Sequence, residues 1–252
     1  MSDFDRNVAA RGAYADRAVA VDAGLRAYML SVYNYMAIAV ALTGVVAWFT
    51  YNAAVITDAT GRITGLTAFG QAIFSGPMVI VLLLGTLGLV FFISFRIHKL
   101  QFTTALTLFM VYSALLGVML SSVFLSYTGA SITRVFFISA ASFGALSLWG
   151  YTTQRDLSGM GSFLIMGLFG IIIASLVNLF LKSSGLDWMI SIIGVGVFAG
   201  LTAYDTQRIK EMYSGMDDAA TLGRKAVMGA LSLYLDFINL FLMLLRLVGD
   251  RR

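Results

Sequence analysis

The stretch "LSLYLDFINLFLMLL" (231–245) contains one charged residue, Asp236, among fourteen uncharged and mostly apolar residues. With its flanks it forms an apolar segment over about 226–247, and a helix of roughly 20 such residues is long enough to cross the hydrocarbon core of a bilayer. The stretch therefore predicts a membrane-spanning helix that carries a carboxyl group in its interior.

The same pattern recurs along the whole chain, which is 59% hydrophobic and only 12% charged. Soluble domains carry about twice that charged fraction, roughly 25%. Six further segments lack charged residues, at 27–57, 63–95, 100–133, 135–154, 157–181 and 188–204. We expect an all-α integral membrane protein with seven helices, at about 28–51, 77–96, 103–126, 133–152, 160–181, 187–208 and 226–247.

The chain divides into a polar N-terminal tail, 1–25, and a single transmembrane domain, 26–252, because no linker could hold a further soluble domain. The apolar run that follows the tail is too long for the core of a signal peptide. Lys and Arg gather in the tail and in the second, fourth and sixth loops, which predicts a cytoplasmic N-terminus. The net charge of +4 is explained by this orientation and needs no nucleic acid.

The C-terminus conflicts with this count, since seven crossings place Arg246, Arg251 and Arg252 outside. Either the charge of these terminal arginines is overruled or the last segment does not cross fully, and seven crossings are the preferred interpretation.

Small residues also indicate where helices contact each other. In "GVGVFAGLTAYD" (194–205), Gly196 and Gly200 are four apart, a spacing that lets membrane helices approach closely.

Apart from Asp187 at the very start of the sixth span, only two acidic residues lie inside the expected spans, Asp205 near the end of the sixth and Asp236 about ten residues into the seventh. A charged side chain at the bilayer centre costs about 3 kcal/mol on insertion scales, so it usually faces the interior of the bundle. One such aspartate could be a structural hydrogen bond. Two on consecutive helices favour a proton or ion site, although counting residues leaves their contact open.

If the two carboxyl groups meet, both cannot easily be ionised in a low dielectric, and they should bind protons in two coupled steps. A divalent cation could replace the proton. Calcium takes six to eight oxygen ligands, so Thr202, Thr206, Asn239, backbone carbonyls or water would have to supplement the carboxylates. We therefore expect transient calcium binding and no tightly bound cofactor.

Enzymatic chemistry has no support in the sequence. There is no cysteine, and the single histidine, His98, lies at a membrane boundary. The lysines lie in loops or at helix ends, and no phosphate-binding loop follows a strand. We expect a protein that is not an enzyme.

Two motifs, "AYDTQRIKEMY" (203–213) and "LSLYLDFINLFLMLLRLVG" (231–249), resemble the Bax inhibitor-1, or transmembrane Bax-inhibitor-motif, family, and most of all its bacterial members. The resemblance implies a seven-helix bundle with the last helix near its centre and a pH-sensitive calcium leak. It further implies that Asp205 and Asp236 form the sensor. A basic residue at the cytoplasmic end of the second helix, here Arg96, would latch onto the first of them, unless Arg96 is an ordinary flanking charge.

Three hypotheses follow. The first is a pH-regulated, calcium-permeable leak channel. The second is a membrane-embedded interaction protein that modulates a membrane protease or a stress or cell-death response through a membrane-protein partner, without conducting ions. The third, a proton-coupled transporter, ranks last because seven spans do not divide into two equal inverted repeats. The expected location is a bacterial inner membrane, with an endomembrane such as the endoplasmic reticulum as the alternative.

Overall fold

In the computed structural model, residues 3–59 and 62–252 are described, with side chains from residue 22 onward. Within this part of the chain, seven helices are long and apolar enough to cross a membrane, as predicted. They are α1 (Asp3–Ala54, with its apolar part at Asp22–Ala54), α3 (Gly76–Arg96), α4 (Phe102–Leu120), α6 (Gly129–Thr152), α7 (Ser158–Leu181), α8 (Ser184–Glu211) and α9 (Ala219–Val248). The chain is an integral, multi-pass membrane protein.

Short elements connect the long helices at the two ends of the bundle, with η1 at the end opposite the others. An antiparallel pair of strands follows α1, and the remaining pieces are single turns of helix. They are β1 (Val55–Thr57), β2 (Ile63–Leu66), α2 (Ala68–Ile73), η1 (Ile97–Lys99) and α5 (Val123–Ser126).

Several helices are capped at the N-terminus by a polar side chain that accepts a hydrogen bond from a backbone N–H of the first turn. Ser75 begins α3 in this way, with Pro77 in the first turn where its missing N–H does no harm. Ser183 begins α8 and Asp218 begins α9. The boundaries of the spans are thus set locally by residues that lie between the apolar runs.

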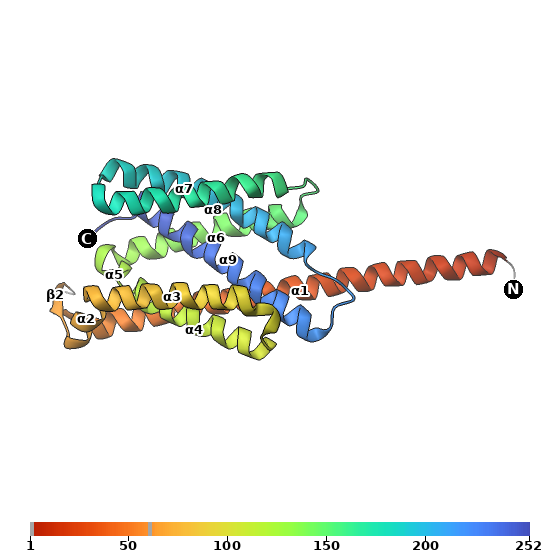
Figure 1. The fold of residues 1–252 in the computed structure, drawn as a ribbon, viewed down its shortest axis with the longest axis horizontal. Coiled ribbons are helices and arrows are strands. Elements are labelled where there is room, and N and C mark those ends of the chain that lie inside the picture. Colours follow the sequence, from red (N-terminus) through yellow and green to blue (C-terminus); the bar gives the residue numbers. More distant parts are fainter. Residues whose placement is uncertain (1–2, 60–61) are drawn as a thin grey trace.

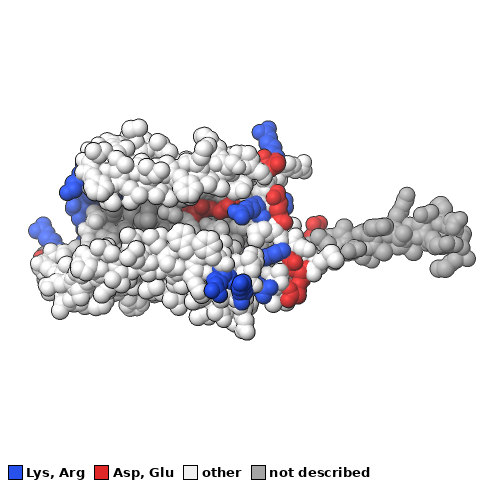
Figure 2. Space-filling view, viewed as in Figure 1, with Lys and Arg blue, Asp and Glu red and all other residues white. Residues whose placement is uncertain are grey.

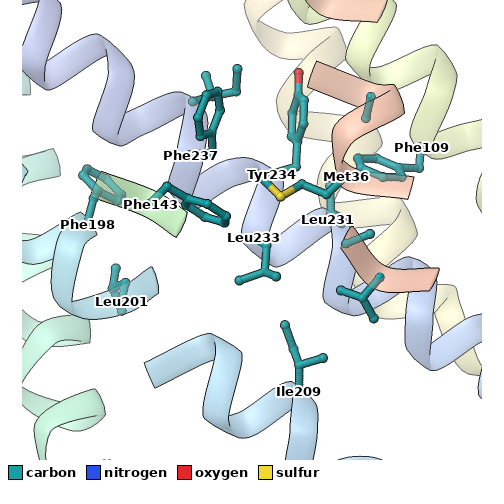
Figure 3. Close-up of a cluster of buried hydrophobic side chains, with 14 of the residues drawn as sticks. Met36, Phe109, Phe143, Phe198, Leu201, Ile209, Leu231, Leu233, Tyr234 and Phe237 are labelled. Carbon is teal, nitrogen blue, oxygen red and sulfur yellow. The ribbon is translucent and has the colours of Figure 1, made fainter. Parts of the chain in front are cut away.

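Helix α9 lies at the centre of the bundle, as expected. Figure 1 shows it crossing between one group of helices formed by α1, α3 and α4 and another formed by α6, α7 and α8. It packs against α8, α1, α6 and α4. Within the most apolar stretch of α9, 67% of the residues are buried. The corresponding share is 11% in both α3 and α7, which face outward. The buried side chains around α9, among them Phe143, Leu233 and Phe237, are drawn in Figure 3.

The C-terminus lies at the end of the bundle opposite the start of α9, so the last helix runs the full length of the bundle. The N–H of Arg252 donates to the carbonyl of Ser126 at 3.0 Å. Asp187, at the start of α8, lies 3.8 Å from both Arg246 and Arg251. Two of the three arginines that conflicted with seven crossings are therefore near a carboxylate. Figure 2 shows charged side chains concentrated toward the two ends of the molecule.

Close helix packing occurs around α8, but only partly where the sequence predicted it. A Cβ on Gly200 would meet Leu164 of α7 at 2.8 Å, whereas Gly196 has nothing within 4 Å and does not mediate a contact. Gly194 instead meets Met243 of α9. The closest approach is that of α6, where a Cβ on Gly150 would lie 2.2 Å from the carbonyl oxygen of Ala203. The glycine spacing thus correctly predicted close packing of α8, but of the two predicted residues only Gly200 mediates it.

Candidate functional site: a pair of interior carboxylates

Asp236 lies in the most buried part of α9, and only 5% of its surface is exposed. The helix carries it there because α9 is the central helix and packs against four other helices. Its neighbours Leu233 and Tyr234 are fully buried. The oxygen Oδ2 of Asp236 is buried and has no hydrogen-bonding partner among the described residues. A buried polar group without a partner is unfavourable, which marks this carboxylate as a functional candidate.

Asp205 lies on α8 about two turns before that helix ends, and it is partly buried. Helices α8 and α9 pack closely against each other. This packing brings the carboxyl groups of Asp205 and Asp236 close enough to interact. The structure therefore brings together the two acids that the sequence placed only at similar depths. Figure 2 shows acidic atoms in the recess between the two groups of helices.

Arg208 is the cation that acts electrostatically on Asp205 in this structure. It lies three residues further along α8 and is exposed at the end of the bundle where α8 stops. Sequence reasoning used Arg208 only as an orientation charge. The spacing of three residues could have identified it, because side chains at i and i+3 of a helix are neighbours.

Arg96 does not contact the carboxylates in this structure. It ends α3, its side chain is exposed, and α3 packs on α4 and not on α8. Within the described part of the chain, Arg96 forms no ion pair. A latch would require α3 to move toward α8, so its role as a latch stays a prediction.

The predicted supporting residues lie near Asp205 and Asp236 along α8 and α9, and each donates a hydrogen bond to a backbone carbonyl of its own helix. The hydroxyl of Thr202 donates to the carbonyl of Phe198 at 2.8 Å, and that of Thr206 to Thr202 at 2.7 Å. The amide nitrogen of Asn239 donates to the carbonyl of Leu235 at 2.8 Å. Their oxygens remain able to accept or to coordinate, and whether they serve calcium stays a prediction.

A chain of hydroxyl groups next to the site was not anticipated from the sequence. The Tyr33 hydroxyl on α1 lies 2.6 Å from Ser147 Oγ on α6, which lies 2.8 Å from Thr206 Oγ1 on α8. It links three helices beside Asp205. The sequence did carry a signal, because Ser131, Ser139 and Ser147 recur every eight residues and all are buried.

The site is poor in metal ligands. No group of three or more His, Cys, Asp or Glu residues that could hold a metal occurs where side chains are described. Two carboxylates provide few of the six to eight oxygens that calcium prefers. The arrangement suits protons or the brief passage of a cation more than its storage.

Fold and site together define a class: helical membrane proteins with a pair of carboxylates in the bundle interior. The chain belongs to the Bax inhibitor family. The family described as "Inhibitor of apoptosis-promoting Bax1" matches residues 25–252. This range covers all seven spanning helices and both aspartates.

Several bacterial proteins are similar over nearly their whole length. The inner membrane protein YbhL of Escherichia coli K12 is 48% identical over 239 residues, covering 94% of this chain and 97% of YbhL. An uncharacterized protein of Rickettsia prowazekii is 52% identical over 234 residues, covering 92% of both chains. One of Caulobacter vibrioides is 43% identical over 259 residues and covers both chains completely.

Proposed function

We propose that this protein is a pH-sensitive, calcium-permeable leak channel in which Asp205 and Asp236 form the sensor. The observation that carries the proposal is the Asp236 carboxyl group, which is 5% exposed, has an oxygen without a hydrogen bond among the described residues, and interacts with a second carboxyl group. The resemblance to the Bax inhibitor family supports calcium as the permeant ion.

Protonation is the physical event that the sensor detects. When both carboxyl groups are ionised, two like charges share a site of low dielectric, which is unfavourable. A proton relieves this repulsion at lower pH, and a divalent cation relieves it when the protons have left. Because the carboxyl groups belong to α8 and α9, a change in their repulsion acts directly on the packing of these two helices.

The second element of the proposal is the latch. Arg96 ends α3, and α3 is buried by only 11%, so few contacts hold it in place. A movement of α3 toward α8 would bring a cation to Asp205 when that carboxylate is ionised. Protonation of Asp205 would weaken this attraction and release α3.

The proposed location is a bacterial inner membrane with the N-terminus in the cytoplasm. The name of YbhL as an inner membrane protein supports the membrane. The orientation is supported by basic residues at the end of the bundle where α3, α6 and α8 stop: Arg96, Lys99, Arg155, Arg208, Lys210, Arg224 and Lys225.

The test is calcium flux from liposomes that contain the purified full chain, measured across a pH series. We expect flux that changes with pH in the natural protein. Asp205→Asn and Asp236→Asn should each remove most of that pH dependence, because an amide does not titrate. Asp156→Asn is the matched control, since Asp156 is exposed in the loop between α6 and α7, and it should behave like the natural protein.

Unchanged flux and unchanged pH dependence in both site variants would overturn the proposal. No flux from the correctly folded natural protein would also overturn it. A stoichiometric membrane-protein partner recovered together with an absence of flux would favour the interaction protein instead.

A further inference from the structure

A long groove runs along the outside of the bundle between α1 and α6. It has a volume of about 830 Å³, and Phe237 of α9 contributes to its lining. We propose that this groove binds one acyl chain of an anionic phospholipid, with the headgroup at Arg26. Neither aspartate lines this groove, and the proposal does not depend on the proposed channel activity.

The lining is apolar along nearly its whole length. Helix α1 contributes Met29 and Val40, and α6 contributes Ala140, Gly144 and Leu148. The groove is open toward the lipid side, since 63% of the surface of Leu148 is exposed within a spanning helix. An occupant that enters sideways must therefore come from the hydrocarbon of the bilayer.

The hydroxyl groups inside the groove are already paired. Tyr33 and Ser147 both line it, and their oxygens lie 2.6 Å apart, so that each satisfies the other. Ser147 also bonds to Thr206. The middle of the groove therefore offers little to a polar ligand, which favours a hydrocarbon chain.

The shape favours a chain over a helix. The groove extends along α1 from Arg26 to Ala41, which is about 22 Å at the helical rise of 1.5 Å per residue. An elongated groove of this length suits an extended acyl chain, which is narrower than a helix with its side chains at about 10–12 Å.

Charge sets the orientation of the lipid. Arg26 lines one end of the groove, is exposed, and forms no ion pair within the described residues. Tyr151 lines the same end, and the Lys210 ammonium lies 5.1 Å from the centre of its ring. One carboxylate, Asp22, lies a turn before Arg26. The Arg26 guanidinium and the Lys210 ammonium thus both lie at this end of the groove, at the membrane boundary, where basic groups favour a negatively charged headgroup.

The first experiment measures lipid binding by native mass spectrometry of the full chain in detergent, with phosphatidylglycerol and phosphatidylcholine of identical acyl chains. We expect tighter binding of phosphatidylglycerol. Gly144→Phe should abolish that preference by filling the groove, because Gly144 has open space around its Cβ direction. Gly170→Phe is the matched control, since Gly170 on α7 has the same open surroundings away from the groove, and it should bind as the natural protein does.

A second variant tests the proposed contact between the lipid headgroup and Arg26. Arg26→Gln should weaken phosphatidylglycerol binding about fivefold, since one basic residue near an anionic lipid contributes about 1 kcal/mol. Lys99→Gln, which removes an exposed cation elsewhere at the same end, should leave binding unchanged. Equal binding of the two lipids, or equal effects of Arg26→Gln and Lys99→Gln, would overturn the assignment of the headgroup.

A labelling experiment keeps the proposal testable if Gly144→Phe disturbs the fold. The chain has no cysteine, so Gly144→Cys and Gly170→Cys each provide a single site for a fluorophore. Phosphatidylglycerol with brominated chains should quench the label at position 144 at lower lipid fractions than at 170. Identical quenching would overturn the proposal, as would a Gly144→Phe variant that changes the oligomeric state and leaves lipid binding unaltered.

Discussion

Helices α3 and α9 are both apolar enough to span a membrane, yet they lie in opposite environments. The more hydropathic of the two, α3, is only 11% buried, while α9 is 67% buried. Leu84 of α3 has 63% of its surface exposed, and Leu233 of α9 has none. In a soluble protein the order would be reversed, since burial there follows hydrophobicity.

The comparison shows how the bilayer changes which helices are buried in the protein. Lipid is as apolar as leucine, so a purely apolar helix such as α3 gains little by leaving it. Helix α9 carries Asp236, Tyr234 and Asn239, and these polar groups are more favourable inside the protein than in lipid. Tyr234 illustrates this, because its hydroxyl lies 2.6 Å from that of Thr43 on α1. The helix with the polar residues therefore becomes the centre.

The largest effect should come from removing packing at the centre. Leu233→Ala should lower the free energy of unfolding by about 3 kcal/mol, because the cavity left in a fully buried position cannot be filled. Leu84→Ala on α3 should change it by less than about 0.5 kcal/mol, since lipid replaces the lost atoms. Unfolding in mixed detergent micelles measures both, and equal losses would contradict the comparison.

A smaller loss should follow from adding atoms at a close helix contact. Gly150→Val should cost about 2 kcal/mol, because its Cβ would lie 2.2 Å from the backbone oxygen of Ala203, which cannot move alone. Gly85→Val on α3 meets nothing within 4 Å and should not destabilise. The same unfolding assay checks the pair, and a tolerated Gly150→Val would show that α6 and α8 are further apart than described.

The smallest expected effect on stability concerns the residues that cap the N-termini of α9 and α3. Asp218 accepts a hydrogen bond from the N–H of Thr221 at 3.3 Å, while α3 begins at the uncharged Ser75. The hydrogen bond with Thr221 holds the pKa of Asp218 below its usual value of 3.8. A lowered pKa means that the ionised cap stabilises the protein above pH 3.8, and that this contribution is lost as the pH falls through the folded-state pKa.

We therefore expect Asp218→Ala to lower the melting temperature slightly at pH 7, and to lower it by less as the pH falls below 3.8. Asp218→Asn keeps a capping side chain and should remove the pH-dependent part of the difference. Ser75→Ala, the control on α3, should show no such change with pH. A constant difference between Asp218→Ala and the natural protein from pH 7 to 3 would contradict the prediction.

Much of the fold was predictable because the bilayer restricts the choices. Uncharged runs of sufficient length can only be helices in lipid, so all seven spans were found and only their ends differ, as for α9, predicted at 226–247 and observed at Ala219–Val248. Packing partners were harder, since the spacing pointed to Gly196 and Gly200, whereas Gly194 and Gly200 are the two that meet side chains of other helices. That choice depends on how α8 is rotated.

By itself, the sequence determined the class, the number of crossings, and the two acids that a membrane helix carries only for a reason. Each follows from the transfer of residues between water and lipid, which is a local property of the chain. Only the tertiary structure decided that Asp205 and Asp236 meet, that Arg208 acts on Asp205 while Arg96 lies apart from both aspartates, and that α1 and α6 leave a groove. These features depend on the rotation and tilt of packed helices, which are set by contacts between residues far apart in the sequence.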